Sequence, residues 1–154
     1  MLITWIQVSH WKSSITVFKH AIKVTDKKYP GFSVVHNNLG SALFAKQKNE
    51  EAISHYKMAI GLKPDYAEAY SNLGAVLVAE GKNEEAISQY KMAIKLQPDY
   101  AKAYNNLGSA LFVERKIEEA ISHFKMAIKI NPDFALAQKN LETVLRSMEM
   151  QDLF

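Results

Sequence analysis

The sequence predicts an all-α solenoid of stacked antiparallel helix pairs, and three observations lead to this prediction. A unit of about 34 residues recurs, because residues 67–100 return almost unchanged as residues 101–134. Residues 33–66 are an earlier copy of the unit, and residues 135–154 are a half copy. Within each full copy, apolar residues follow the helical i, i+3, i+7 spacing twice in succession. A single helix pair cannot bury its own apolar face, so the copies are expected to stack on one another.

Each copy predicts two amphipathic helices separated by a helix-breaking turn. In the middle copy, Tyr70 and Leu77 mark the buried side of the first helix, and the same rhythm resumes at Ala86 in the second. Gly81 stands where the first helix should end. Gly74 and Ala86 are small, so we expect the two backbones to approach closely at these residues.

Polar residues at the helix starts predict side-chain caps. Asn49 and Asn83 are placed to cap the second helices of the first two full copies, and Asp65 and Asp99 to cap the first helices that follow them. In the third copy Ile117 holds the place of the asparagine, so that cap is expected to be lost.

The spacing of the Leu-Gly pair, the two alanines, the aromatic residue and the proline resembles that of the tetratricopeptide repeat (TPR) family. The resemblance implies a right-handed solenoid with a degenerate N-terminal repeat or cap, three full repeats and a C-terminal capping helix: residues 1–32, 33–66, 67–100, 101–134 and 135–154. The last copy has Glu142 where the others have glycine, so no second helix is expected to pack there.

The N-terminal segment is the least regular part of the chain. Phe18 and Ile22 match the aromatic and apolar positions of a second helix, which we expect to begin at about Ser13. The apolar run before it spans about ten residues, fewer than the ~20 needed to cross a bilayer. Trp5 and Trp11 cannot both face inward on one regular helix. We therefore expect an apolar patch that either pairs with a second copy or continues into a membrane or another domain.

A second, local resemblance concerns residues 5–25. This segment is similar to the junction at which the last membrane helix runs into C-terminal TPRs in bacterial glycosyltransferase-like proteins related to protein O-mannosyltransferases. The resemblance implies that the chain is a piece of a larger membrane protein. The alternative is an irregular cap whose tryptophans cover the open face of the first full repeat, as solenoid ends require.

The surface of interest for function is the inner, concave face, which the first helix of each repeat is expected to line. An unbroken asparagine column follows it: Asn38, Asn72, Asn106 and Asn140. A carboxamide donates and accepts hydrogen bonds, so such a row could hold the main chain of an extended peptide without selecting its side chains. The row resembles the asparagine ladder of the O-linked N-acetylglucosamine transferase family, which implies peptide binding. The other residues of the predicted peptide-binding set lie in adjacent columns: Asn37, Ser71, Asn105, Phe44, Phe112 and Lys102.

A different TPR mode clamps a terminal carboxylate with lysine, arginine and asparagine on the concave face. The matching columns here hold Asn37, Ser41, Asn72, Lys102, Asn105 and Ser109, so the required basic pair is mostly missing. Lys102 alone could meet an acidic group, and this clamp is the weaker alternative.

Composition argues against several other functions. The net charge is only +3 and the lysines are spread through the repeats, so no nucleic-acid partner is expected. Cysteine is absent, so neither a disulfide nor a thiolate metal site is expected. His55 and His123 correspond to Gln89 in the middle copy, which argues against a histidine metal ladder. No cofactor is predicted, and the repeated methionines are expected to pack between units: Met58, Met92 and Met126.

The sequence contains no recognisable carriers of catalysis. It has no glycine-rich phosphate loop, no HExxH motif and no nucleophile turn. We therefore predict a non-enzymatic scaffold that binds a protein or peptide in its concave groove. The alternatives are an accessory or substrate-recruiting domain of a membrane-bound glycosyltransferase-like protein, and a self-assembly module. The sequence leaves the compartment open between the cytoplasm and the extracytoplasmic side of a membrane protein.

Overall fold

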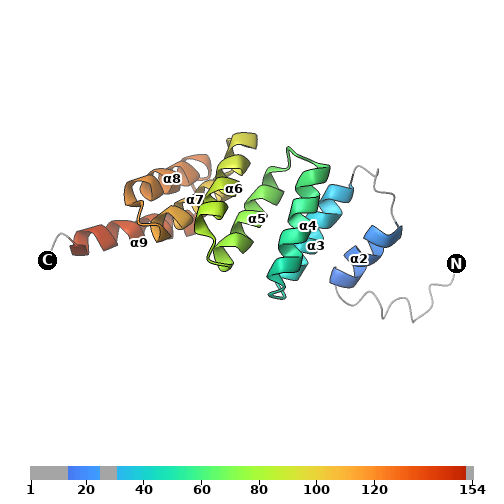
Figure 1. Ribbon diagram of the computed structural model, residues 1–154. Helices are drawn as coiled ribbons and strands as arrows, with labels where there is room; N and C mark the ends of the chain where they lie inside the picture. Colours follow the sequence, from blue (N-terminus) through green and yellow to red (C-terminus); the bar gives the residue numbers. More distant parts are fainter. Residues whose placement is uncertain (1–13, 25–30, 152–154) are drawn as a thin grey trace.

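The computed structural model describes residues 14–24 and 31–151, and this part of the chain is helical apart from short connections (Figure 1). The helices in chain order are α2 (Ser14–Val24), α3 (Phe32–Phe44), α4 (Asn49–Leu62), α5 (Ala67–Ala79), α6 (Asn83–Leu96), α7 (Ala101–Val113), α8 (Ile117–Ile130) and α9 (Ala135–Gln151). The prediction of an all-α fold is confirmed. The expectations for Trp5 and Trp11 concern residues outside the described part of the chain.

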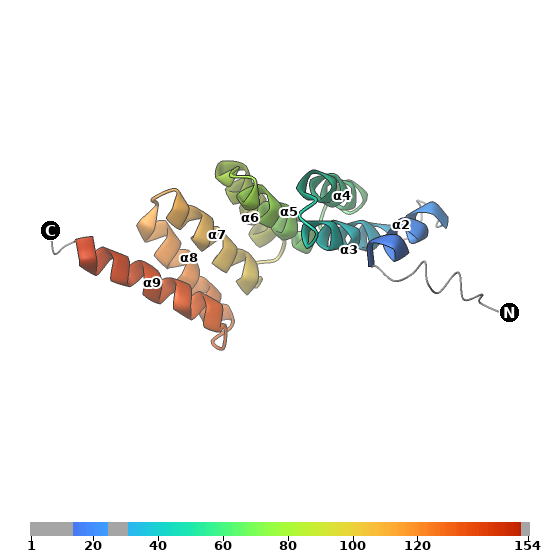
Figure 2. The same cartoon turned by 90° about the horizontal axis from the view of Figure 1, so that it is seen from below.

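The helices form three antiparallel hairpins that stack side by side. The hairpins are α3–α4, α5–α6 and α7–α8, and each packs on the next through its second helix. At the ends of the stack, α2 packs on α3 and α9 packs on α8 (Figure 1 and Figure 2). This arrangement is the solenoid that the repeats predict, and the single helix α9 stands in place of a fourth hairpin. None of the described helices combines the length and apolar character needed to cross a membrane.

The first helix of each hairpin lies on the inner side of the curved stack. α3 contacts α5, α5 contacts α7, and α7 contacts α9, whereas the second helices of the described hairpins make no comparable contacts with one another. Helices on the inner side of a curved solenoid lie closer together than helices on its outer side. The concave face is therefore formed by α3, α5, α7 and α9, as the sequence predicts.

A glycine in each first helix makes room for an aromatic ring from the second helix. A methyl group added to Gly74 would lie 2.6 Å from the ring of Tyr90, closer than carbon atoms normally approach. The same contact at 2.8 Å joins the other two pairs: Gly40 with Tyr56, and Gly108 with Phe124. The expectation of a close approach at Gly74 was correct, but its partner is the Tyr90 ring and not Ala86.

The helix starts differ from the side-chain caps that the sequence predicted. α4 and α6 begin at Asn49 and Asn83 themselves, and neither helix has a side-chain cap bond. The Asn49 amide instead donates to Oε1 of Glu80 in the next hairpin at 2.6 Å. Helices α5 and α7 follow Tyr66 and Tyr100, again without a side-chain cap bond. The predicted caps were wrong because the tight turns between helices are closed by backbone hydrogen bonds.

The core is one cluster of buried side chains that continues along the stack. Phe18 and Ile22 of α2 pack against this cluster, as expected for a second helix of a degenerate repeat. The three repeated methionines, in contrast, are between 38% and 47% exposed. The expectation that they pack between units was wrong, because they are among the exposed large apolar side chains and do not belong to the buried cluster.

Candidate functional site

The asparagine column lies on four consecutive inner helices. Asn38, Asn72, Asn106 and Asn140 belong to α3, α5, α7 and α9, and all four are partly exposed. Each occupies the same position in its repeat, so the column follows the concave face from hairpin to hairpin. These carboxamides are therefore partly accessible to solvent.

The neighbouring polar column is buried. Asn37, Ser71 and Asn105 are only 1%, 1% and 2% exposed. Asn37 instead donates through Nδ2 to Oε1 of Glu68 in the next hairpin at 3.3 Å. The expectation that these three side chains contact a ligand is thus revised, because in the free chain they face the junctions between repeats.

Hydrogen bonds between repeats join the two columns. Asn72 donates through Nδ2 to Oδ1 of Asn37 at 3.0 Å. Asn140 donates through Nδ2 to Oδ1 of Asn105 at 2.9 Å. Each bond satisfies a buried carbonyl oxygen and holds the outer carboxamide in one orientation. The Oδ1 atoms of Asn72 and Asn140 are then left for other partners.

The junction between α5 and α7 lacks this bond. The Ser71 side chain is shorter than an asparagine, and its buried Oγ lies beside the Tyr100 hydroxyl without a hydrogen bond to Asn106. Asn106 instead accepts through Oδ1 from Nδ2 of Asn105 at 3.4 Å. At this junction the Nδ2 group of Asn106 is therefore left for other partners.

A hollow of ≈ 240 Å³ lies at the same junction. Its lining is mostly apolar and comes from both hairpins: Ala75, Val78, Tyr90, Asn106, Ser109, Ala110 and Val113. Val78 and Val113 are 36% and 59% exposed, an unusual state for valine. Sequence reasoning missed Val113, although an apolar residue on the solvent side at the end of an amphipathic helix was a usable signal. The site thus combines an apolar hollow with a carboxamide at its edge.

The remaining predicted groove residues are an aromatic pair and a lysine. Phe44 and Phe112 are partly exposed and pack against the core. Lys102 is exposed in the first turn of α7, one turn before Asn106. It brings a positive charge to the N-terminal end of α7, whereas the hollow lies along the rest of that helix, from Asn106 to Val113.

A second hollow, of ≈ 440 Å³, lies at the C-terminal end of the stack. Ile128 of α8 and Leu141 and Leu145 of α9 form its apolar lining. Glu142 and Arg146, which also line it, are hydrogen-bonded to each other at 2.7 Å. This hollow occupies the place at which the second helix of a further hairpin would pack.

The three histidines of the hairpins contact rings within their own hairpins. His55 lies against His36, and His123 lies against Tyr104 with ring centroids 5.8 Å apart. Over residues 14–24 and 31–151, no group of three or more histidine, aspartate or glutamate side chains is arranged to hold a metal ion.

The repeats match known family models over most of their length. A TPR repeat model matches residues 40–81 and 76–113, and the tetratricopeptide repeat model matches residues 101–134. The chain therefore belongs to the tetratricopeptide repeat family. No curated protein matches the sequence significantly.

Several solved TPR domains share the fold. The first TPR domain of Spaghetti (RPAP3), bound to the HSP90 peptide SRMEEVD, is 25% identical with a TM-score of 0.73, over 76% of this chain and 93% of that one. The Sgt2 TPR domain from Aspergillus fumigatus is 26% identical with a TM-score of 0.76, over 79% and 82%. The second TPR domain of human RPAP3, in complex with the HSP70 peptide SGPTIEEVD, is 26% identical with a TM-score of 0.71, over 75% and 98%. TPR domains are in general protein-interaction modules without catalytic activity.

Proposed function

We propose that this chain is a scaffold that binds an extended segment of a protein partner along the concave face. The observation that carries the proposal is the junction of α5 and α7, where an apolar hollow adjoins the partly exposed carboxamide of Asn106. Two solved domains of the same fold hold peptides, which supports a peptide as the class of ligand.

The carboxamides can meet the polar groups of an extended main chain. Asn72 and Asn140 use Nδ2 to bond the preceding repeat, so each offers Oδ1 to a peptide N–H. Asn106 uses Oδ1 for Asn105, so it offers Nδ2 to a peptide C=O. Along the groove, Asn72 therefore offers an acceptor, Asn106 a donor and Asn140 an acceptor. An extended peptide exposes both kinds of group along its length and can match this order.

The apolar hollow would select one side chain of the ligand. Val78, Ala110 and Val113 form an apolar lining that suits an aliphatic side chain. Full burial of a valine or leucine side chain contributes about 1.5–3 kcal/mol. In this proposal the hollow supplies most of the affinity, while the carboxamides set the path of the main chain.

A clamp for a terminal carboxylate is the second candidate. The peptides held by the two similar domains favour it, since both end in Glu-Glu-Val-Asp. Lys102 could meet such a carboxylate, but Asn37 and Asn105, which stand in clamp columns, are buried. Peptides with a free and with an amidated C-terminus distinguish the two modes, because only the clamp requires the free carboxylate.

Neither a role beside a membrane glycosyltransferase nor self-assembly gains support. The three similar solved structures are TPR domains, and none of them is a glycosyltransferase. The hypothesis of self-pairing rests on the apolar run before Ser14, which lies outside the described part of the chain. The hypothesis of a membrane junction rests on residues 5–25, of which residues 14–24 are described as α2.

The groove can be tested with peptides selected from a random display library on the immobilised chain. The double variant Asn38→Ala, Asn106→Ala removes two carboxamides, each worth ~0.5–1.5 kcal/mol, so the dissociation constant should rise about 5- to 150-fold. The matched control is Ser54→Ala, Ser122→Ala, because these exposed serines have the same sequence separation on α4 and α8. Peptides that bind both variants as tightly as the parent chain would refute a role for these asparagines.

A further inference from the structure

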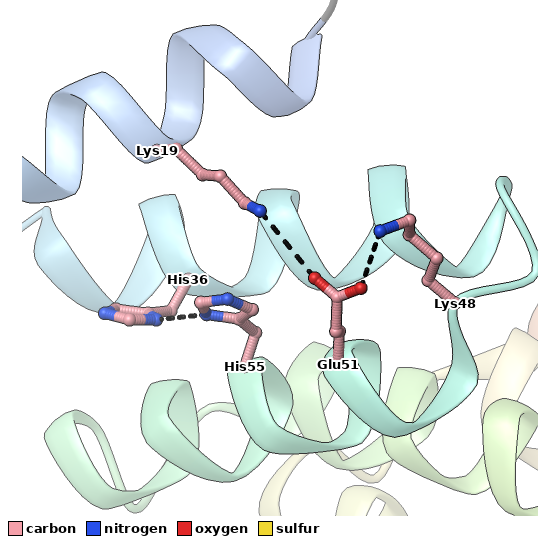
Figure 3. A network of polar contacts seen from close by, with 5 residues as sticks. All are labelled: Lys19, His36, Lys48, Glu51 and His55. Carbon is pink, nitrogen blue, oxygen red and sulfur yellow. Dashed lines mark hydrogen bonds and ion pairs between the residues drawn. The ribbon is translucent and has the colours of Figure 1, made fainter.

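A pair of histidines distinguishes the first hairpin from the other two. His36 of α3 and His55 of α4, here called the histidine pair, face each other with their Nδ1 atoms 2.8 Å apart (Figure 3). Their rings are tilted by 32°, with centroids 5.0 Å apart. Neither of the other hairpins has histidine at both positions: they hold Tyr70 with Gln89, and Tyr104 with His123.

The contact depends on a single shared proton. One Nδ1 must donate and the other must accept, because two facing donors would repel each other. His36 is 1% exposed, and its Nε2 atom is buried without a hydrogen-bond partner in the described structure. An unpaired buried N–H is rarer than an unpaired acceptor, which favours His36 as the donor and His55 as the acceptor. A second proton is unfavourable on either ring: on His55 it removes the acceptor, and on His36 it buries a charge that has no partner.

The charges around the histidine pair come from α2 and α4. Lys19 of α2 reaches Oε2 of Glu51 at 3.7 Å, while Lys48 holds Oε1 of the same carboxylate at 2.7 Å (Figure 3). Burial is the main cause that lowers the pKa of both rings. The charge of His55 lowers the pKa of His36 further, and Lys19 lowers that of His55 while Glu51 raises it. A proton added to the histidine pair therefore places positive charge near Lys19 of α2, the helix that covers this end of the stack.

We propose that the histidine pair is an acid-sensitive contact that controls the docking of α2 on the first hairpin. Near neutral pH the shared proton joins α3 to α4, and Lys19 is drawn to Glu51. When both rings are protonated they repel each other and Lys19, so the end of the hairpin rearranges and α2 detaches. For each proton taken up, the docking equilibrium falls by up to about tenfold per pH unit. Release uncovers the apolar surface against which Phe18 and Ile22 pack.

Spin labels can report this release, because the chain has no native cysteine. Labels on Lys23→Cys in α2 and Lys95→Cys in α6 lie at exposed positions of two different parts of the stack. Their separation is measured by pulsed electron paramagnetic resonance at about pH 7.5 and about pH 5, on either side of the ordinary histidine pKa. We expect a narrow distance distribution at the higher pH and a broad one at the lower pH. Circular dichroism should show that the rest of the solenoid keeps its helices.

The repeats supply the controls. His36→Tyr with His55→Gln copies the Tyr70–Gln89 pair of the middle hairpin and should keep the narrow distribution at both pH values. If this double variant does not fold, His55→Gln alone should broaden less than the parent chain at the lower pH, because it removes the repulsion between two protonated rings at a half-buried position. His123→Gln should respond to acid as the parent chain does. The proposal is overturned by equal broadening in the parent and the double variant, by no broadening in the parent, or by loss of helix throughout the parent.

Discussion

Gly74 offers a direct test of how the hairpins pack. A methyl group at this position would lie 2.6 Å from the Tyr90 ring, which is 2% exposed and cannot move without disturbing the core. Overpacking of this kind costs ~1–3 kcal/mol, so we expect Gly74→Ala to carry that cost and Gly74→Leu to carry more. Replacing glycine by alanine inside a helix also gains up to ~1 kcal/mol, which partly masks the clash in the net stability.

Gly61 provides the matched control, because a methyl group at this helical position would meet nothing within 4 Å. Gly61→Ala should therefore show only the gain in helix propensity. The two alanine variants should differ by about 1–3 kcal/mol in free energy of unfolding, measured by urea denaturation with circular dichroism. Equal stability of the two variants would refute the contact and the proposed pairing of α5 with α6 through Gly74 and Tyr90.

Three further predictions use the same unfolding and peptide-binding assays. Asn72→Ala should cost ~1–3 kcal/mol of stability, because it leaves a buried carbonyl oxygen without its donor, whereas Asn38→Ala should stay within about 0.5 kcal/mol of the parent. Burial lowers the pKa of the histidine pair and of His123, so below about pH 6.5 the unfolded chain binds more protons than the folded chain. The free energy of unfolding should then fall as the pH drops through this range, and it should fall less steeply in His123→Gln. A free energy of unfolding that does not change with pH in this range would contradict the lowered pKa values of these histidines. Val113→Asp should weaken selected peptides about 10- to 100-fold by removing the apolar lining, while Leu62→Asp, a change at another exposed apolar residue on α4, should not.

The repeat pattern was enough to predict the hairpins, because glycine and aromatic residues recur at positions where the packing of two helices requires them. The prediction of side-chain caps failed at the helix starts. A cap by Asn49 assumes that the first N–H groups of the helix need a side-chain acceptor, but backbone hydrogen bonds of a tight turn close this helix end. The sequence also could not show which of two neighbouring asparagines is exposed at the edge of the groove. Asn37 and Asn38 are adjacent and chemically identical, yet one is buried and the other is partly exposed. A helical step of ~100° separates them, and only the position of the next hairpin decides which of them is covered.

One residue makes the middle junction different, and this difference bears directly on binding. Ser71 stands where the other repeats have Asn37 and Asn105, and it offers no carbonyl oxygen to Asn106. The same junction holds the apolar hollow. Ser71→Asn would complete the row of bonds between repeats, because an asparagine fits the equivalent buried position in the first and third repeats. We expect it to raise the free energy of unfolding by ~0.5–1.5 kcal/mol.

The same substitution should act on peptide binding in the opposite direction. A new bond to the buried row would draw the Nδ2 group of Asn106 away from the groove, so selected peptides should bind up to about tenfold more weakly. Damage to the fold would lower stability and affinity together, whereas this mechanism raises one and lowers the other. Measuring both quantities on Ser71→Asn therefore separates the two explanations. A variant that gains stability but keeps its affinity would show that the ligand does not use the Asn106 amide, and would leave the hollow as the contact at this junction.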